Sequence, residues 1–147
     1  MRAGSFYLEN VSFEVPSGSY AALMGRTGSG KTTLLEVVTG LKSIVLGSIH
    51  IDDIDVTHLK PAQRNIGYVP QDGALFAGMR VREQLAFPLE IRRRSRSSIN
   101  SRVQELAKML EITHLLDRTI VGLSGGERQR VALGRALSFH PGTLCLD

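Results

Sequence analysis

The amino-acid sequence predicts an α/β fold, with a parallel β-sheet, antiparallel strands near the N-terminus and an inserted α-helical subdomain. Three observations favour this class. Short apolar segments with strand composition alternate along the chain with segments of helical periodicity. One apolar run, residues 20–24, leads directly into a glycine-rich loop that is followed by a helical pattern. A separate helical stripe occupies residues 98–116.

Size and composition fit a single compact domain. The 147 residues are 42% hydrophobic and 22% charged, which supports a packed core and argues against disorder. No apolar stretch approaches the roughly 20 residues of a membrane span, and no signal-peptide core follows Met1. The single cysteine, Cys145, excludes an internal disulfide framework. The net charge of +4 permits contact with anions, but the chain lacks tryptophan and basic–aromatic alternation, so we expect no nucleic-acid partner.

The N-terminal part predicts strands and one helix. Residues 6–8 and 11–15 have strand composition, and Pro16-Ser17-Gly18 predicts a turn between antiparallel strands. Residues 20–24 predict a strand that is buried on both faces. After the glycine-rich loop, apolar residues recur at helical spacing and Gly40 marks the predicted helix end; they are Leu34, Leu35, Val37, Val38 and Leu41.

The rest of the chain alternates in the same way. Residues 48–51 and 66–69 predict short strands. The stripe in residues 98–116 predicts a helix capped by Ser98 or Asn100, with an apolar face of Ile99, Val103, Leu106 and Leu110. A last helix is predicted over about residues 127–138, burying Val131, Leu133, Ala136 and Leu137. A buried strand that contains Cys145 follows at residues 143–146.

Residues 25–32 match the pattern G-x-x-x-x-G-K-[ST], which predicts a phosphate-binding loop and a P-loop NTPase-type sheet. Glycines let the backbone close around an anion, and the following helix directs its positive N-terminal end at the same place. Lys31 supplies a charge for the β- and γ-phosphates, and the Thr32 hydroxyl is a ligand for Mg²⁺. The predicted nucleotide-binding residues here are Gly25, Arg26, Thr27, Gly28, Ser29, Gly30, Lys31, Thr32 and Thr33.

A second motif, Leu123-Ser124-Gly125-Gly126-Glu127-Arg128-Gln129-Arg130, resembles the signature sequence of ATP-binding cassette (ABC) ATPases. Physically it is another helix start preceded by glycines and a hydroxyl group, and therefore a second candidate anion site. The resemblance implies that Ser124, Gly125, Gly126 and Glu127 close over the γ-phosphate of an ATP held by another subunit. It further implies a homodimer or heterodimer of cassettes with ATP at the interface.

Two further residues take their predicted roles from the same resemblance. Gln71, after the predicted strand 66–69 and Pro70, is similar to the Q-loop glutamine, which reaches Mg²⁺ and the attacking water. Asp147 resembles the Walker B aspartate, which holds Mg²⁺ beside Thr32; an aspartate at the carboxyl end of a strand also suits ligand binding in an open α/β sheet. The implied catalytic residues are Lys31, Gln71 and Asp147, the implied metal residues are Thr32, Gln71 and Asp147, and the cofactors are ATP and Mg²⁺.

The resemblance covers the chain as one incomplete ABC ATP-binding domain, residues 1–147. Residues 1–70 and 127–147 are predicted to form the nucleotide-binding core, and about 72–126 the helical subdomain with the signature. The family's catalytic glutamate and switch histidine follow the Walker B aspartate, so we expect the C-terminal part of the domain to be missing. We therefore predict weak ATP binding and little turnover by this chain.

The implied function is that of the ATP-binding subunit of an ABC transporter, an importer of the sulfate, molybdate or sugar type. Its partners would be transmembrane permease subunits, which would hold it on the cytoplasmic face of the membrane. One alternative is a soluble ABC ATPase of DNA repair or translation. Repair types insert long coiled coils, unlike the short segment between Gln71 and Ser124, and translation types carry two cassettes. Another alternative is a non-catalytic remnant that binds nucleotide.

Overall fold

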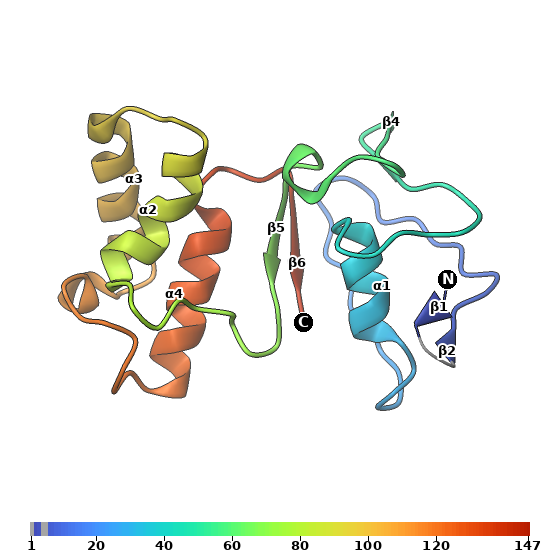
Figure 1. Ribbon diagram of the computed structural model, residues 1–147, viewed down its shortest axis with the longest axis horizontal. Helices are drawn as coiled ribbons and strands as arrows, with labels where there is room; N and C mark the ends of the chain where they lie inside the picture. Colours follow the sequence, from blue (N-terminus) through green and yellow to red (C-terminus); the bar gives the residue numbers. More distant parts are fainter. Residues whose placement is uncertain (1, 4–5) are drawn as a thin grey trace. The chain divides into compact units, whose positions relative to one another are not determined.

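The computed structural model describes residues 2–3 and 6–147 and divides the chain into two compact units (Figure 1). The first unit comprises Met1–Asn65 together with Asp147, and the second comprises Ile66–Leu146. Both units combine helices with short strands, so the α/β class is confirmed.

The first unit is built around one helix, α1 (Lys31–Val38). Strand β1 (Arg2–Ala3) pairs antiparallel with β2 (Phe6–Tyr7), and β3 (His50–Ile51) pairs antiparallel with β4 (Ile54–Asp55). A 3₁₀ turn, η1, spans Pro61–Gln63. The helix ends before Gly40, whose φ of 83° is the left-handed conformation that glycine favours, as the sequence predicts. Antiparallel strands are present near the N-terminus, as expected, but β1 pairs with β2, and the predicted turn at residues 16–18 joins no strands in the part of the chain that the structure describes.

The strand predicted over residues 20–24 is wrong, and so is the one over residues 11–15. Neither segment takes part in the sheets of the described chain, although the turn between them forms, with the Ser19 amide donating to the Pro16 carbonyl at 3.2 Å. Tyr20 is 104% exposed and Met24 is 88% exposed. A strand exists only where neighbouring strands satisfy its backbone groups, and apolar composition does not supply a partner. Leu41, assigned to the apolar helix face, lies beyond α1 and is exposed.

The second unit packs helices against a pair of parallel strands. Strand β5 (Ile66–Val69) pairs with β6 (Thr143–Leu146) in the register Ile66–Thr143 to Val69–Leu146, which confirms both predicted strands. The helices are α2 (Val81–Ile91), α3 (Arg96–Met109) and α4 (Gly125–Leu137), with a 3₁₀ turn η2 (Thr113–Leu115). Helix α4 contacts both β5 and α2, and Figure 1 shows it between them. The Cys145 side chain is buried, as predicted, but the strand around it is not a buried one, because Leu144 is 36% exposed and Leu146 is 58% exposed.

The predicted stripe forms the buried face of α3, but the helix limits differ from the prediction. Ile99, Val103 and Leu106 are buried. The helix begins one turn earlier, because the Ser95 hydroxyl, rather than Ser98 or Asn100, caps it by accepting a bond from the Ser98 amide at 3.3 Å. It ends at Met109, and the following residues form η2 instead of continuing the helix.

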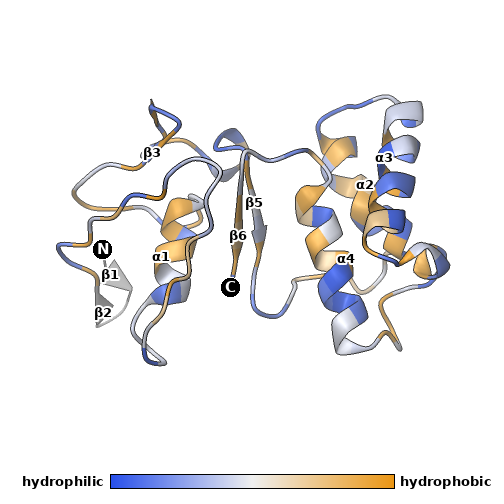
Figure 2. Cartoon of the chain, turned by 180° about the vertical axis from the view of Figure 1, so that it is seen from behind, coloured by the Kyte–Doolittle hydropathy of each residue, from blue (hydrophilic) through white to orange (hydrophobic). Residues whose placement is uncertain are grey.

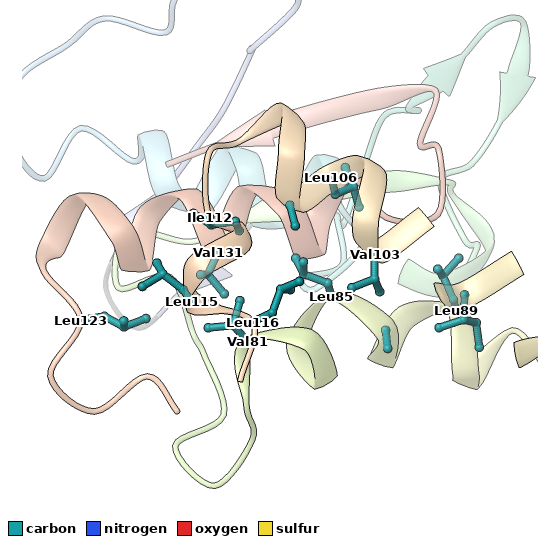
Figure 3. Close-up of a cluster of buried hydrophobic side chains, with 13 residues drawn as sticks. Val81, Leu85, Leu89, Val103, Leu106, Ile112, Leu115, Leu116, Leu123 and Val131 are labelled. Atoms are coloured by element: carbon teal, nitrogen blue, oxygen red, sulfur yellow. The ribbon is translucent and has the colours of Figure 1, made fainter. Parts of the chain in front are cut away.

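The main hydrophobic core lies between α2, α3 and α4 (Figure 3). Helix α2 was not singled out from the sequence, because Pro88 interrupts its pattern. Figure 2 shows α4 hydrophilic in its first turns and apolar further along, where it meets the core. The fully buried side chains of this core include Val81, Leu85, Leu106, Ile112, Leu115 and Val131.

Gly134→Ala should destabilise the second unit by about 1 kcal/mol. A Cβ at this position would lie 2.6 Å from Leu85 Cδ2 and 2.9 Å from Leu110 Cδ1. Overpacking typically costs about 1–3 kcal/mol, and the helix propensity of alanine offsets about 1 kcal/mol of it. Urea unfolding measures the change, with Gly78→Ala as the control because nothing lies within 4 Å of its added Cβ. Equal stability of the two variants would contradict the prediction.

Candidate functional site

The glycine-rich loop before α1 adopts a closed turn with a defined backbone. The Ser29 amide donates to the Arg26 carbonyl at 3.1 Å. Gly28 and Gly30 have φ values of 79° and 94°, and Gly30 is the N-cap of α1. Left-handed conformations at these two positions are costly for any residue with a Cβ, so the loop depends on its glycines. The sequence motif therefore corresponds to a turn that only this pattern of glycines allows without strain.

Lys31 spans this loop. Its Nζ donates to the carbonyl oxygens of Gly25 and Arg26, at 2.9 Å each. The positive charge is thereby held over the loop before any ligand binds. The first amides of α1, those of Lys31, Thr32 and Thr33, have no acceptor within the helix, and the helix dipole adds partial positive charge at this end. The loop and helix start form a cationic, donor-rich site suited to a phosphate group.

Thr32 and Asp147 lie together although 115 positions separate them in the chain. The Thr32 hydroxyl donates to Asp147 Oδ1 at 3.0 Å. A hydroxyl and a carboxylate oxygen are hard ligands of the kind that Mg²⁺ takes from proteins, which use few side chains and leave the other positions to water and phosphate. Among residues 2–3 and 6–147, no group of three or more His, Cys, Asp or Glu side chains could hold a metal by itself. The pair fits a magnesium ion that is completed by a phosphate ligand.

In the second unit, the predicted signature forms the start of α4. Ser124 is the N-cap, and its hydroxyl oxygen accepts the Glu127 amide at 3.3 Å while Glu127 Oε2 accepts the Ser124 amide at 2.7 Å. The Ser124 backbone bond is the main cause that lowers the pKa of the Glu127 carboxyl, followed by the Ser124 side chain. Ser124, Gly125 and Gly126 are all exposed, so this helix start is open to a ligand.

Gln71 lies in the same unit, in the turn that follows β5, and is exposed. The Gly73 amide donates to the Pro70 carbonyl at 2.8 Å, and the Ala74 amide donates to Asp72 Oδ1 at 3.0 Å. These bonds give the turn a compact shape. The side chain of Gln71 therefore projects from an ordered turn rather than from a long loop.

The structure thus brings the predicted site residues together in two groups. The first unit holds the loop residues 25–33 with Asp147, and the second holds Ser124–Glu127 on α4 and Gln71 after β5. Three polar residues that the sequence did not single out support these groups. Arg64 binds carbonyls at the end of α1, while Gln84 and Arg135 bind the chain after Gln71. The sequence around Gln84 gives no signal for its role, because Arg82 and Glu83 directly before it are also polar.

Comparison with known proteins gives both a family match and a match to a solved structure. The ABC transporter family model matches residues 8–147. A solved dimeric ATP-binding cassette in a post-hydrolysis state, bound to ADP and Pi, superposes with a TM-score of 0.82 at 30% identity. The superposition covers 92% of this chain and 62% of that chain. In the described part of the chain, none of the helices is long and apolar enough to cross a membrane.

Sequence relatives carry the names of import proteins. The molybdate/tungstate import ATP-binding protein WtpC of Pyrococcus abyssi is 45% identical over 142 residues, which are 97% of this chain and 41% of the relative. The sulfate/thiosulfate import ATP-binding protein CysA of Thermosynechococcus vestitus is 47% identical over 145 residues, 98% of this chain and 43% of the relative. The sn-glycerol-3-phosphate import ATP-binding protein UgpC of Cereibacter sphaeroides is 44% identical over 145 residues, 99% and 42% respectively.

This chain therefore spans less than half the length of these import proteins. The matched region includes the glycine-rich loop, the turn that carries Gln71 and the start of α4, and the family model extends to Asp147. Both the parallel strand pair and the helical part fit the cassette fold of the solved relative. On this agreement of motif, fold and sequence, the chain belongs to the ABC transporter family.

Proposed function

We propose that this chain binds Mg-ATP and acts as part of the ATP-binding subunit of an importer. The observation that carries the proposal is the geometry around the start of α1. Lys31 is held over the glycine loop by two 2.9 Å bonds, and the Thr32 hydroxyl lies 3.0 Å from the Asp147 carboxylate. Such an arrangement offers a cation for the terminal phosphates and two oxygens for the metal.

Each group has a role in this proposal. The Lys31 ammonium group exchanges its loop carbonyls for the β- and γ-phosphate oxygens, while the exposed amides of the loop and first helical turn bind phosphate oxygens. Thr32 and Asp147 hold Mg²⁺, which neutralises charge on the phosphates when bound. By its resemblance to the Q-loop glutamine, Gln71 would reach the metal and orient the attacking water. Together these residues position the reactants and stabilise negative charge, which is how phosphoryl transfer is mainly catalysed.

The start of α4 is proposed to bind the γ-phosphate of an ATP on a partner cassette. Ser124, Gly125 and Gly126 are exposed, and the helix dipole favours an anion there. A bond from the Glu127 amide leaves the Ser124 hydroxyl free to donate its own proton to a phosphate oxygen. The dimeric form of the solved cassette relative supports assembly of two such chains.

Import is the transport direction we propose, with permease subunits in the membrane as partners and the cytoplasmic face as the location. The import proteins to which this chain is similar support this choice over DNA repair or translation. Their names include molybdate, tungstate, sulfate and glycerol phosphate, so we propose an anionic cargo. We also propose a division of the domain. In it, the nucleotide-binding core comprises residues 1–70 and 127–147, and the helical subdomain comprises about residues 72–126.

Thr32→Val tests the magnesium role directly. Wild-type protein should bind ATP more tightly with Mg²⁺ than with EDTA. In the variant, the ratio of these two affinities should fall about tenfold, because the hydroxyl ligand is absent. Titration with ATP in both buffers, followed by calorimetry, measures the effect. The control is Thr113→Val, which removes an exposed hydroxyl in the second unit. An equal loss of affinity with and without Mg²⁺ would contradict the proposal.

A further inference from the structure

The chain that follows Gln71 is held by a guanidinium group from α4. Arg135 Nη1 donates to the Ala74 carbonyl at 2.7 Å, and Nη2 donates to the Gly73 carbonyl at 2.9 Å. The same guanidinium lies 5.3 Å from the Phe76 ring centroid. Partial burial lowers the pKa of Arg135 and the Asp72 carboxylate raises it, but arginine stays charged in proteins. The two terminal nitrogens of the planar guanidinium group (its fork) thus bind two consecutive carbonyls of the turn.

A second side chain, Gln84 of α2, holds the next part of the same turn. Its Nε2 donates to the Phe76 carbonyl at 2.6 Å, and its Oε1 accepts the Phe76 amide at 3.2 Å. The side chain is fully buried, so losing either bond would leave a polar group without water to replace its partner. Together, Arg135 and Gln84 bind the backbone of residues 73–76 at four points.

The backbone of this turn requires such support. Gly73 has a φ of 72° and Ala74 a φ of 43°, and the second value is costly for a residue with a side chain. An added Cβ on Gly73 would lie 3.4 Å from the Ala132 side chain, so the turn also lies close to α4. In this conformation the Ala74 carbonyl accepts a bond from Arg135 and the Ala74 amide donates to the Asp72 carboxylate. These two bonds set the direction in which the chain leaves Gln71.

We infer that Arg135 and Gln84 are positioning residues that fix the Gln71 turn to α4, so that Gln71 and the phosphate-binding start of α4 move as one body. This inference rests on the proposed function of Gln71 and Ser124. Arg135 lies eleven residues after Ser124 on a continuous helix, a rigid length of about 16 Å. A displacement of the α4 start by a ligand is then transmitted through Arg135 to the Gln71 turn.

Hydrogen exchange tests the mechanical part without any need for turnover. In the full chain, Arg135→Met should speed exchange of the amides in residues 71–76 by at least tenfold. Arg102→Met is the matched control, because Arg102 also binds two carbonyls at the C-terminal end of α4, those of Ser138 at 3.2 Å and Leu137 at 2.8 Å, but none in residues 71–76. It should leave exchange in residues 71–76 unchanged. Equal exchange in the two variants would overturn the inference.

Turnover tests whether the positioning acts through Gln71. Arg135→Met should lower kcat about tenfold with KM for ATP nearly unchanged, and Arg135→Lys, which keeps the charge but not the fork, should lie between it and wild type. In a Gln71→Ala background, Arg135→Met should cause no further loss. Additive losses would overturn the inference while leaving the proposed function intact. Absence of Mg-ATP binding by wild-type protein would instead overturn the proposed function, and exchange would still decide the positioning role.

Discussion

Replacing Lys31 with methionine will weaken Mg-ATP binding by roughly 100-fold, or about 2.7 kcal/mol. The ammonium group lies over the glycine loop, where it donates to the Gly25 and Arg26 carbonyls. These carbonyls belong to exposed residues, so water replaces the lost bonds and the fold stays intact. The lost phosphate contacts have no such replacement, because a charge-assisted hydrogen bond contributes about 1.5–3 kcal/mol.

Binding is the better measurement for this variant, because it reports the phosphate contacts of Lys31 without depending on turnover. Fluorescent nucleotide titration with thermal unfolding in parallel separates lost contacts from lost structure. The matched control is Lys42→Met, which removes the same charge near the other end of α1, where Lys42 pairs with Glu36 at 2.5 Å. Its ATP affinity should stay within about twofold of wild type. Unchanged affinity in Lys31→Met would refute the phosphate role.

Arg64→Met will lower the free energy of unfolding of the first unit by about 3 kcal/mol, the largest stability effect that we expect. The Arg64 side chain is 5% exposed and donates to four backbone carbonyls, those of Val37, Val38, Thr57 and Leu59, at 2.9–3.0 Å. Burial lowers the pKa of the guanidinium, but its hydrogen bonds keep it satisfied as a cation. Without it, buried carbonyls lose their partners at about 1–3 kcal/mol each, with some relief from relaxation.

This arginine also stabilises the helix that begins at the phosphate loop. Val37 and Val38 are the last residues of α1, so a cation there satisfies free carbonyls and complements the helix dipole. Urea unfolding should show Arg64→Lys intermediate between wild type and Arg64→Met. Arg82→Met is the control, since Arg82 forms an exposed ion pair with Asp117 and should contribute less than about 1 kcal/mol. A similar loss in both variants would contradict this explanation.

The candidate site was largely predictable, because local chemistry defines it. A phosphate loop needs glycines at positions with positive φ, and Gly28 and Gly30 have that conformation. A capping hydroxyl favours a helix start, and at α4 Ser124 provides one together with Glu127. Such features depend on a few adjacent residues, so spacing alone identifies them. The helical stripe of α3 and the strands β5 and β6 were predictable for the same reason, since their periodicity and composition are local.

By itself, the sequence determined the α/β class, the conformation of the glycine loop, the capped start of α4 and the residues of the α3 core face. Only the tertiary structure decided which apolar segments become strands, and it left residues 20–24 unpaired and exposed. It also brought Thr32 to Asp147 and Arg135 to the turn after Gln71. The physical reason is that helix capping and periodicity are local, whereas strand pairing and long-range hydrogen bonds require partners that are distant in the chain.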